Sequence, residues 1–205
     1  MPRGAALACT VARLPFHVFP ALPVLQRQTF LQASDSPTQA AHARDTLRLL
    51  VAQDGSTTRL CETAAGGPIT VHLLEQQVVR AVPPAVQAAL PGTSFIERIT
   101  SLSAHGEVMM DNLSYIALEG LPADIRRDLE AGVLPIGHLL ARMWVRREFL
   151  PPDAGLYQRL WGASGVPDAE ASRTYRILTP EGPRMLIAES YRRGMLMQPP
   201  AAPAG

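Results

Sequence analysis

Cysteine is scarce in this chain and its charges nearly cancel. The 205 residues include only Cys9 and Cys61, so no CxxC pair or Cys/His cluster offers the spacing of a metal site. We therefore expect two reduced thiols in a cytoplasmic protein that binds no metal. The formal net charge is +1, and basic residues gather only in pairs such as Arg146-Arg147. Without a basic patch, a nucleic acid is not expected as a partner.

Long apolar segments and short catalytic motifs are absent as well. The longest uncharged run, residues 81 to 96, contains Pro83, Pro84 and Pro91, which excludes a membrane helix there. The first residues faintly suggest a signal peptide, but an arginine and a proline cut the apolar stretch short. No internal repeat, GxGxxG, phosphate loop, GxSxG or HExxH occurs. We expect a protein that does not associate with a membrane.

What remains has the composition of one globular domain. A chain of 205 residues that is 47% hydrophobic can bury a substantial core. Residues 1–40, rich in proline, alanine and glutamine, are interpreted as an N-terminal extension that can include helix. The domain is placed at residues 41–197. Residues 198–205, QPPAAPAG, are expected to form a disordered tail.

The hydrophobic periodicity predicts an α+β domain with one antiparallel sheet. Leucine spacing favours a helix that ends near Gln53, and two proline-initiated patterns predict short helices over 121–132 and 135–145. Alternating segments and turn signals predict three hairpins, and hence six strands. These strands are predicted at residues 56–63, 68–79, 94–102, 108–118, 172–180 and 184–193. The segment RMWVRRE, residues 142–148, favours a solvated helix edge, from which Arg146 or Arg147 could attract an anionic substrate.

An arginine interrupts the apolar face of one predicted strand. In SFIERITSL, residues 94–102, alternation places Arg98 on the face of Ile96 and Leu102. The last strand places Glu189 on a similarly apolar face, where an ionised carboxylate needs a partner. Two interpretations follow: Arg98 and Glu189 satisfy each other or other polar groups inside the sheet, or both line a pocket for an anionic, oxygenated ligand.

A resemblance bears on this choice. The segments DGSTTRL, ITVHLLEQ, SFIERITSL, LPIGHLL and PRMLIAES occur in an order and spacing similar to the chorismate pyruvate-lyase family, particularly its actinobacterial and archaeal branch. The similarity runs from about residue 45 to about residue 196. It implies a chorismate lyase-like domain whose six-stranded antiparallel sheet is covered by helices over a buried pocket.

The same resemblance implies which residues would form the site. Arg98 takes the position of an arginine that holds a carboxylate, and Glu189 that of a glutamate in the final strand. Ile136 takes a position whose backbone meets the ligand. The turn GSTTR supplies a further amide in one of two registers, from Ser56 or from Thr57, and we favour Thr57.

The implied activity is elimination of pyruvate from chorismate to give 4-hydroxybenzoate. Aromatisation drives that reaction, so orientation and electrostatics suffice and no cofactor is expected. Arg98 and Glu189 are the expected catalytic residues, and chorismate and 4-hydroxybenzoate the expected partners. Two alternatives stay open: a non-catalytic ligand-binding domain, of the kind attached to some bacterial transcription regulators, or an enzyme that makes another hydroxybenzoate. The oligomeric state is not indicated by the sequence.

Overall fold

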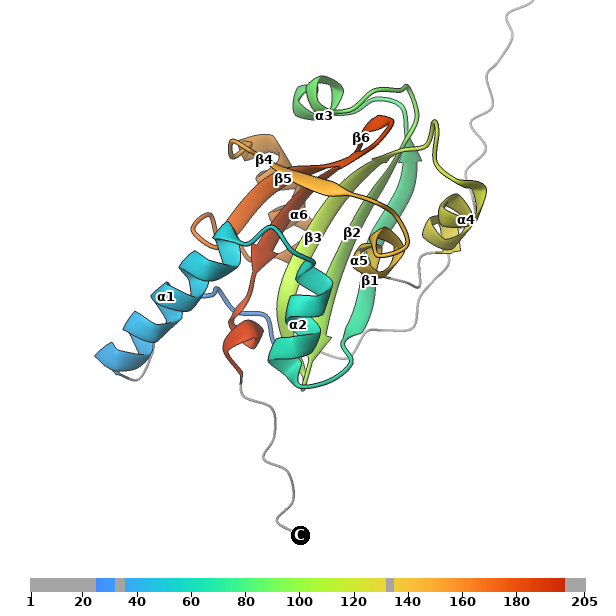
Figure 1. The fold of residues 1–205 in the computed structure, drawn as a ribbon. Helices are drawn as coiled ribbons and strands as arrows, with labels where there is room; N and C mark the ends of the chain where they lie inside the picture. The colour runs from blue at the N-terminus through green and yellow to red at the C-terminus, as the bar shows by residue number, and fades with distance from the viewer. Residues whose placement is uncertain (1–24, 32–35, 132–134, 198–205) are drawn as a thin grey trace, which may run out of the picture.

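A six-stranded antiparallel sheet forms the centre of the domain (Figure 1). The computed structural model describes residues 25–31, 36–131 and 135–197. The strand order is β1-β2-β3-β6-β5-β4, and every neighbouring pair is antiparallel. The strands are β1 Thr70–Val79, β2 Phe95–Ala104, β3 Glu107–Ala117, β4 Arg146–Leu150, β5 Ser172–Thr179 and β6 Gly182–Tyr191. The predicted fold class, a single α+β domain with six antiparallel strands, is confirmed.

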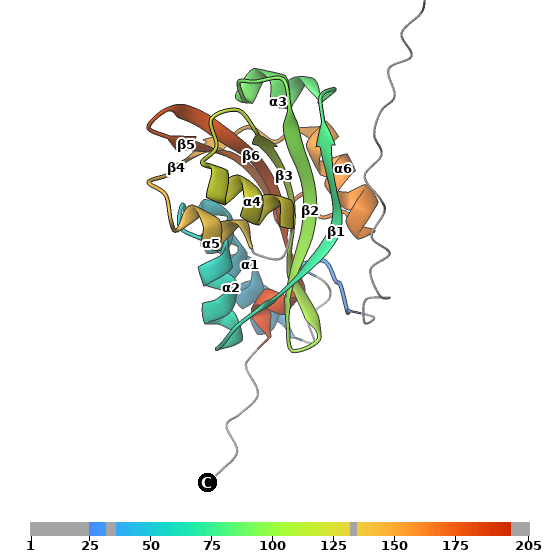
Figure 2. The same cartoon turned by 90° about the vertical axis from the view of Figure 1, so that its right-hand side faces the viewer.

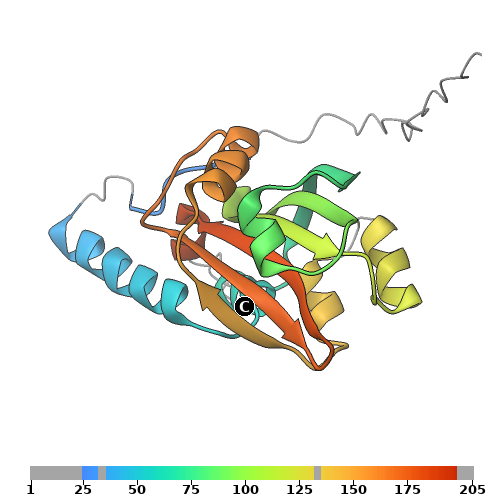
Figure 3. The same cartoon turned by 90° about the horizontal axis from the view of Figure 1, so that it is seen from above.

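Helices cover both faces of this sheet (Figures 2 and 3). One face carries helices α1, α2, α4 and α5 and the short 3-10 helix η1, and the opposite face carries α3 and α6. These elements are α1 Pro37–Ala52, α2 Thr57–Ala65, α3 Pro84–Ala89, α4 Ala123–Ala131, α5 Ile136–Leu140, α6 Ala154–Ser164 and η1 Arg193–Leu196. We call the face under α2 and α5 the site face, because the cavity described below lies there.

Two of the three predicted hairpins are confirmed. Strands β2 and β3 turn through His105 and Gly106, whose φ angles of 52° and 81° are those of a tight left-handed turn. Strands β5 and β6 turn before Gly182, with φ at 113°, a value that favours glycine. Both hairpins follow the alternation and the turn residues of the sequence. Helix α1 ends at Ala52 with Gln53 as its C-cap, as predicted.

The first predicted hairpin is wrong, and the sixth strand lies elsewhere. Residues 57–65 form helix α2, which Ser56 caps by accepting a hydrogen bond from the Arg59 amide and Gly66 ends with a φ of 68°. The threonines and the cysteine of this segment favour strands weakly, and burial of one face of the helix outweighs that preference. The sixth strand is β4, Arg146–Leu150, in the segment that we interpreted as a helix edge. It is short and carries three charged residues, so it shows little alternation.

Residues 25–31 also contact the domain. Gln26 forms a bridge with Glu107, and Phe30 is fully buried. Arg27 donates hydrogen bonds to Asp111 (3.2 Å), to a serine hydroxyl of β2 (2.8 Å) and to the carbonyl at the end of α6 (2.9 Å). The domain boundary proposed at residue 41 stays a prediction. The tail at 198–205 and Cys9 lie outside the described residues.

Candidate functional site

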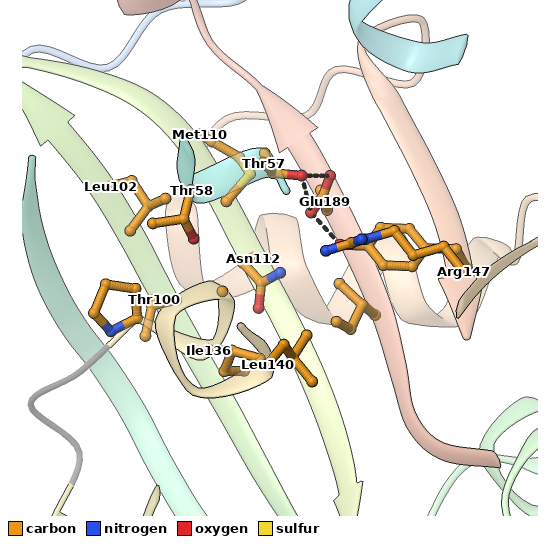
Figure 4. Close-up of a pocket in the computed structure, with 14 residues that line it drawn as sticks. Thr57, Thr58, Thr100, Leu102, Met110, Asn112, Ile136, Leu140, Arg147 and Glu189 are labelled. Atoms are coloured by element: carbon orange, nitrogen blue, oxygen red, sulfur yellow. Dashed lines mark hydrogen bonds between the residues drawn. The ribbon is translucent and has the colours of Figure 1, made fainter. Parts of the chain in front are cut away.

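A small cavity lies on the site face, between the sheet and helices α2 and α5 (Figure 4). Its volume is about 30 Å³, which holds one or two water molecules, whereas a cavity of about 150 Å³ is needed to admit benzene. A ring-sized ligand therefore needs a wider cavity than this structure shows. The walls combine apolar side chains with hydroxyl, amide and charged groups. They are formed by Thr57, Thr58, Thr100, Leu102, Met110, Asn112, Pro135, Ile136, Gly137, Leu140, Arg147, Tyr175, Ile187 and Glu189.

The floor of the cavity contains a row of polar side chains across four strands. Thr100 of β2 is paired with Asn112 of β3, Asn112 with Glu189 of β6, and Glu189 with Arg173 of β5. Because directly opposite residues of neighbouring strands point to the same face, all four side chains lie on the site face. We call this set the polar row.

The carboxylate of Glu189 is held by three donors. Its side chain is 1% exposed and accepts hydrogen bonds from the Tyr175 hydroxyl (2.5 Å), the Thr57 hydroxyl (2.9 Å) and Arg173 Nε (2.9 Å). Burial raises the pKa of the Tyr175 hydroxyl well above its ordinary value, and the neighbouring Glu189 charge raises it further. The Tyr175 hydroxyl therefore keeps its proton and donates, and Glu189 accepts hydrogen bonds at both carboxylate oxygens.

Arg173 fastens this carboxylate to helix α1. Its Nη1 donates to the carbonyls of Leu50 (3.0 Å) and Gln53 (2.5 Å), and its Nη2 donates to the Thr57 hydroxyl (3.0 Å). Burial lowers the pKa of Arg173, but the Glu189 charge and the neighbouring tyrosines raise it, so that the pKa lies above its ordinary value. The guanidinium also stacks within 5.2 to 5.5 Å of the centres of three aromatic rings. It therefore joins two helices to the sheet.

Glu189 is satisfied by other polar groups inside the sheet, as one form of the structural interpretation has it, and a pairing of Arg98 with Glu189 is wrong. Arg173 is the ion-pair partner of Glu189, at 2.9 Å, and strand β3 lies between the strands of Arg98 and Glu189. Two strand spacings amount to about 10 Å, too far for an ion pair between opposite residues. Arg98 also lies two residues along β2 from Thr100 of the polar row, and it is opposite Ser114.

Arg98 is on the predicted face but does not line the cavity. It is fully buried and lies two residues from Thr100 along β2. Burial lowers the pKa of its guanidinium to about 10, so the side chain still carries a positive charge at neutral pH. Its role in binding a carboxylate stays a prediction.

Thr57 and Ile136 are both brought to the cavity by helix N-termini. Thr57 is the first residue of α2, after the N-cap Ser56, so the predicted GSTTR turn is the start of a helix. Its hydroxyl, rather than its amide, makes the hydrogen bond to Glu189. Ile136 is the first residue of α5, after Pro135. The nine-residue helix α2 directs its partial positive charge towards the cavity.

Arg147 is the charged residue that sequence reasoning undervalued. It lines the cavity from β4 and reaches towards Asn112 and Glu189 (Figure 4). Its Nη1 donates to the Asp54 carbonyl (3.1 Å), its guanidinium carbon lies 5.9 Å from the centre of the Tyr175 ring, and its buried Nε has no hydrogen bond to any described residue. The signal in the sequence was the Arg146-Arg147 pair, but a helical interpretation of that segment gave no reason to place Arg147 at the pocket.

A larger cavity of about 290 Å³ lies on the opposite face of the sheet. Alanine, leucine and proline form most of its walls, together with Thr174, and its two charged residues are already engaged: Asp153 caps helix α6 and Arg176 pairs with Glu148. We place the functional site at the smaller cavity, because its polar groups converge on one point.

No group of three or more His, Cys, Asp or Glu residues suited to a metal ion occurs among residues 25–31, 36–131 and 135–197. Cys61 is buried in α2, and burial raises the pKa of its thiol. Within the same ranges, no helix has the length and apolar character to cross a bilayer.

The roof of the cavity depends on a close approach between α5 and α2. A Cβ atom on Gly137 would lie 2.2 Å from Thr58 Oγ1 and 3.2 Å from Ser56 Oγ. We therefore expect Gly137→Ala to push α5 away from α2 and to reduce stability by about 1 to 3 kcal/mol.

Gly162→Ala is the matched control, because Gly162 is also helical and a Cβ there meets nothing within 4 Å. It should raise stability by roughly 0.5 to 1 kcal/mol. Urea unfolding of both variants checks this, and equal stabilities would contradict the close packing.

Comparisons with known proteins give likenesses of fold only. No protein-family model and no curated protein matches the chain. Among solved structures, PhnF from Mycobacterium smegmatis is 13% identical, with 75% of this chain and 80% of that chain covered and a TM-score of 0.41. The C-terminal domain of the histidine utilization repressor from Pseudomonas syringae is 9% identical, with 60% and 91% covered and a TM-score of 0.39. A ligand-binding domain assigned to a GntR-family transcriptional regulator from Bordetella bronchiseptica is 15% identical, with 61% and 83% covered and a TM-score of 0.38. Identities and TM-scores this low carry no functional argument.

Proposed function

We propose that the cavity on the site face binds a small organic anion, a ring compound that carries a carboxylate, without transforming it. The observation that carries this proposal is the charge around the cavity. Arg147 lines the cavity and Arg173 lies beside it, whereas Glu189 is the acidic residue among the described residues that line it. Buried positive charge in excess of negative charge is costly, and an anion that enters the site offsets that cost.

The other walls suit the same class of ligand. The N-terminus of α2 borders the cavity at Thr57 and Thr58, and a helix N-terminus favours an anion. Apolar side chains from the sheet and from α5, among them Leu102, Ile136 and Ile187, can pack against a ring. Chorismate and 4-hydroxybenzoate both belong to this class, as do many other carboxylates.

Binding is favoured over catalysis by the contacts of Glu189. Its carboxylate accepts hydrogen bonds from Arg173, Tyr175 and Thr57, so both of its oxygens are already engaged by protein groups. Elimination of pyruvate from chorismate is the second candidate. It is favoured by the position of Glu189 on the cavity wall, next to a tyrosine hydroxyl, and by the resemblance described above.

A pair of probes that differ only in charge tests the binding proposal. Benzoate and benzamide have nearly the same shape, so calorimetric titration of each reports the contribution of the anion. We expect benzoate to bind at least about tenfold more tightly, since a hydrogen bond to a charged group contributes about 1.5 to 3 kcal/mol. Equal affinities, or no binding of either probe or of 4-hydroxybenzoate, would contradict an anion site.

The same samples distinguish binding from catalysis. After incubation with chorismate, chromatography of the products should show no 4-hydroxybenzoate beyond that formed without protein. Formation of 4-hydroxybenzoate and pyruvate at a rate that depends on protein concentration would establish the second candidate instead. A different hydroxybenzoate would point to an enzyme of related chemistry.

A further inference from the structure

The amide oxygen of Asn112 is buried at the floor of the cavity and accepts no hydrogen bond from any described residue. Its side chain is 7% exposed, Oδ1 is inaccessible and unbonded, and no described residue forms a hydrogen bond with either end of the amide. Figure 4 shows it between Thr100 and Glu189, facing the cavity. A buried polar group without a partner lowers the stability of the folded state, and few exist in native proteins.

The neighbours of Asn112 explain why the protein itself does not satisfy this amide. In the polar row, Glu189 and Arg173 satisfy each other, and the remaining donors to Glu189 come from Thr57 and Tyr175. On the other side, the Thr100 hydroxyl makes no hydrogen bond to a described residue. The two halves of the polar row therefore differ: the half on β5 and β6 is complete, and the half on β2 and β3 is open.

Several other buried polar groups on β2 and β3 have hydrogen-bond partners, whereas Gln76 Oε1 of β1 and Thr174 Oγ1 of β5, like Asn112 Oδ1, have none among the described residues. The Ser103 hydroxyl on β2 forms a hydrogen bond with His72 Nε2 (2.7 Å). The Ser101 hydroxyl donates a hydrogen bond to Asp111 Oδ1 (2.5 Å). Unlike Ser101 and Ser103, Asn112 lines the cavity. A ligand in the cavity could therefore supply the hydrogen-bond partner of its amide.

We infer that Asn112 is a specificity-determining residue, whose amide forms hydrogen bonds with a ring hydroxyl of the bound anion, assisted by Thr100. This inference rests on the function proposed above and narrows it to hydroxylated ring carboxylates. An amide both donates and accepts hydrogen bonds, as a hydroxyl does, so the two groups can satisfy each other. The carboxylate is the feature that the arginines recognise, and the hydroxyl is the feature that Asn112 recognises.

The test measures how much a ring hydroxyl group contributes to ligand affinity in the wild type and in Asn112→Leu. This variant keeps the branched shape of the side chain and removes its polar atoms. Benzoate, 3-hydroxybenzoate and 4-hydroxybenzoate are titrated into both proteins. We expect the wild type to favour one hydroxybenzoate over benzoate by about tenfold, the usual effect of one neutral hydrogen bond. In Asn112→Leu this preference should fall to less than about twofold, with benzoate affinity retained.

A melting curve of the unliganded proteins supplies a second readout that needs no ligand. Because Asn112→Leu removes an unsatisfied buried amide, its melting temperature should rise, by about 2 to 4 °C. Ser103→Ala is the matched control, since it removes a buried polar group that has a partner, and its melting temperature should fall. Ligand affinity should not change in this control.

The outcomes separate the inference from the function on which it rests. Unchanged preference for the hydroxybenzoate in Asn112→Leu overturns the role of Asn112, although benzoate binding still supports the anion site. A fall in melting temperature comparable to that of Ser103→Ala also overturns it, because Asn112 would then be structural. If none of the three probes binds the wild type, the proposed function fails, and the inference fails with it.

Discussion

Glu189→Leu should destabilise the protein by about 3 to 5 kcal/mol, the effect expected when one partner of a buried ion pair is removed. The guanidinium of Arg173 would remain 5% exposed without its counter-charge. Its bonds to the carbonyls of Leu50 and Gln53 would persist, but the anchor for Nε would be lost. Urea unfolding monitored by circular dichroism measures the change in the free energy of unfolding.

A double variant and a surface control show whether the effect belongs to the pair. Arg173→Met combined with Glu189→Leu should recover much of the lost stability, because no unpaired charge remains, and the coupling energy follows from the double-mutant cycle. Glu130→Ala breaks the exposed Arg126–Glu130 pair, at 2.8 Å, and should change stability by less than about 1 kcal/mol. A Glu189→Leu variant as stable as Glu130→Ala would show that the buried pair contributes little.

Arg98→Met should reduce the affinity for benzoate by about a hundredfold, because it removes a desolvated positive charge beside the cavity. Arg98 is fully buried, so water is largely excluded from around its charge. An anion near that charge is attracted more strongly than one near a solvated arginine. Titration of benzoate into the variant measures the loss, and a melting curve confirms that the variant is folded.

Arg147→Met is the comparison that assigns the carboxylate to one of the two arginines. Arg147 is half-buried, and its guanidinium is already bonded to the Asp54 carbonyl and stacked near Tyr175. We expect a smaller loss, of about tenfold. If Arg147→Met abolishes benzoate binding and a folded Arg98→Met retains it, the carboxylate lies against β4 and the role that the resemblance gives to Arg98 is wrong.

The parts of the fold that the sequence predicts are those in which neighbouring segments pair through a tight turn. Strands β2 and β3, and β5 and β6, show alternation and end at turn residues such as Gly106 and Gly182, so local information suffices. Helix α2 was predicted as a strand because its threonines suit either structure, and contact with η1 and β2 decides between them. Strand β4 has five residues, too few to establish a period.

Three of the four predicted site residues, Thr57, Ile136 and Glu189, line the cavity, and Arg98 does not. Their roles in binding a ligand stay predictions, and the pairing of these residues was not predictable. Alternation shows the face to which a side chain points, but it does not show which strands are neighbours. The partner of Glu189 depends on the position of β5 beside β6, and the contact of Arg147 with the cavity depends on β4 at the sheet edge. Neither fact is contained in a local pattern.

The hydrogen bonds of Arg173 make the formation of the cavity depend on the part of the domain that is synthesised last. They join residues that are 123 positions apart at Leu50 and 116 apart at Thr57. The entropy of closing such loops must be lost before any of these contacts contributes. Helices α1 and α2 are synthesised before β5 and β6, so at first they lack the hydrogen bonds from Arg173. A nascent chain that ends before β6 therefore lacks Glu189 and cannot form the cavity, and the apolar face of α2 stays open to other partners, chaperones included, until then.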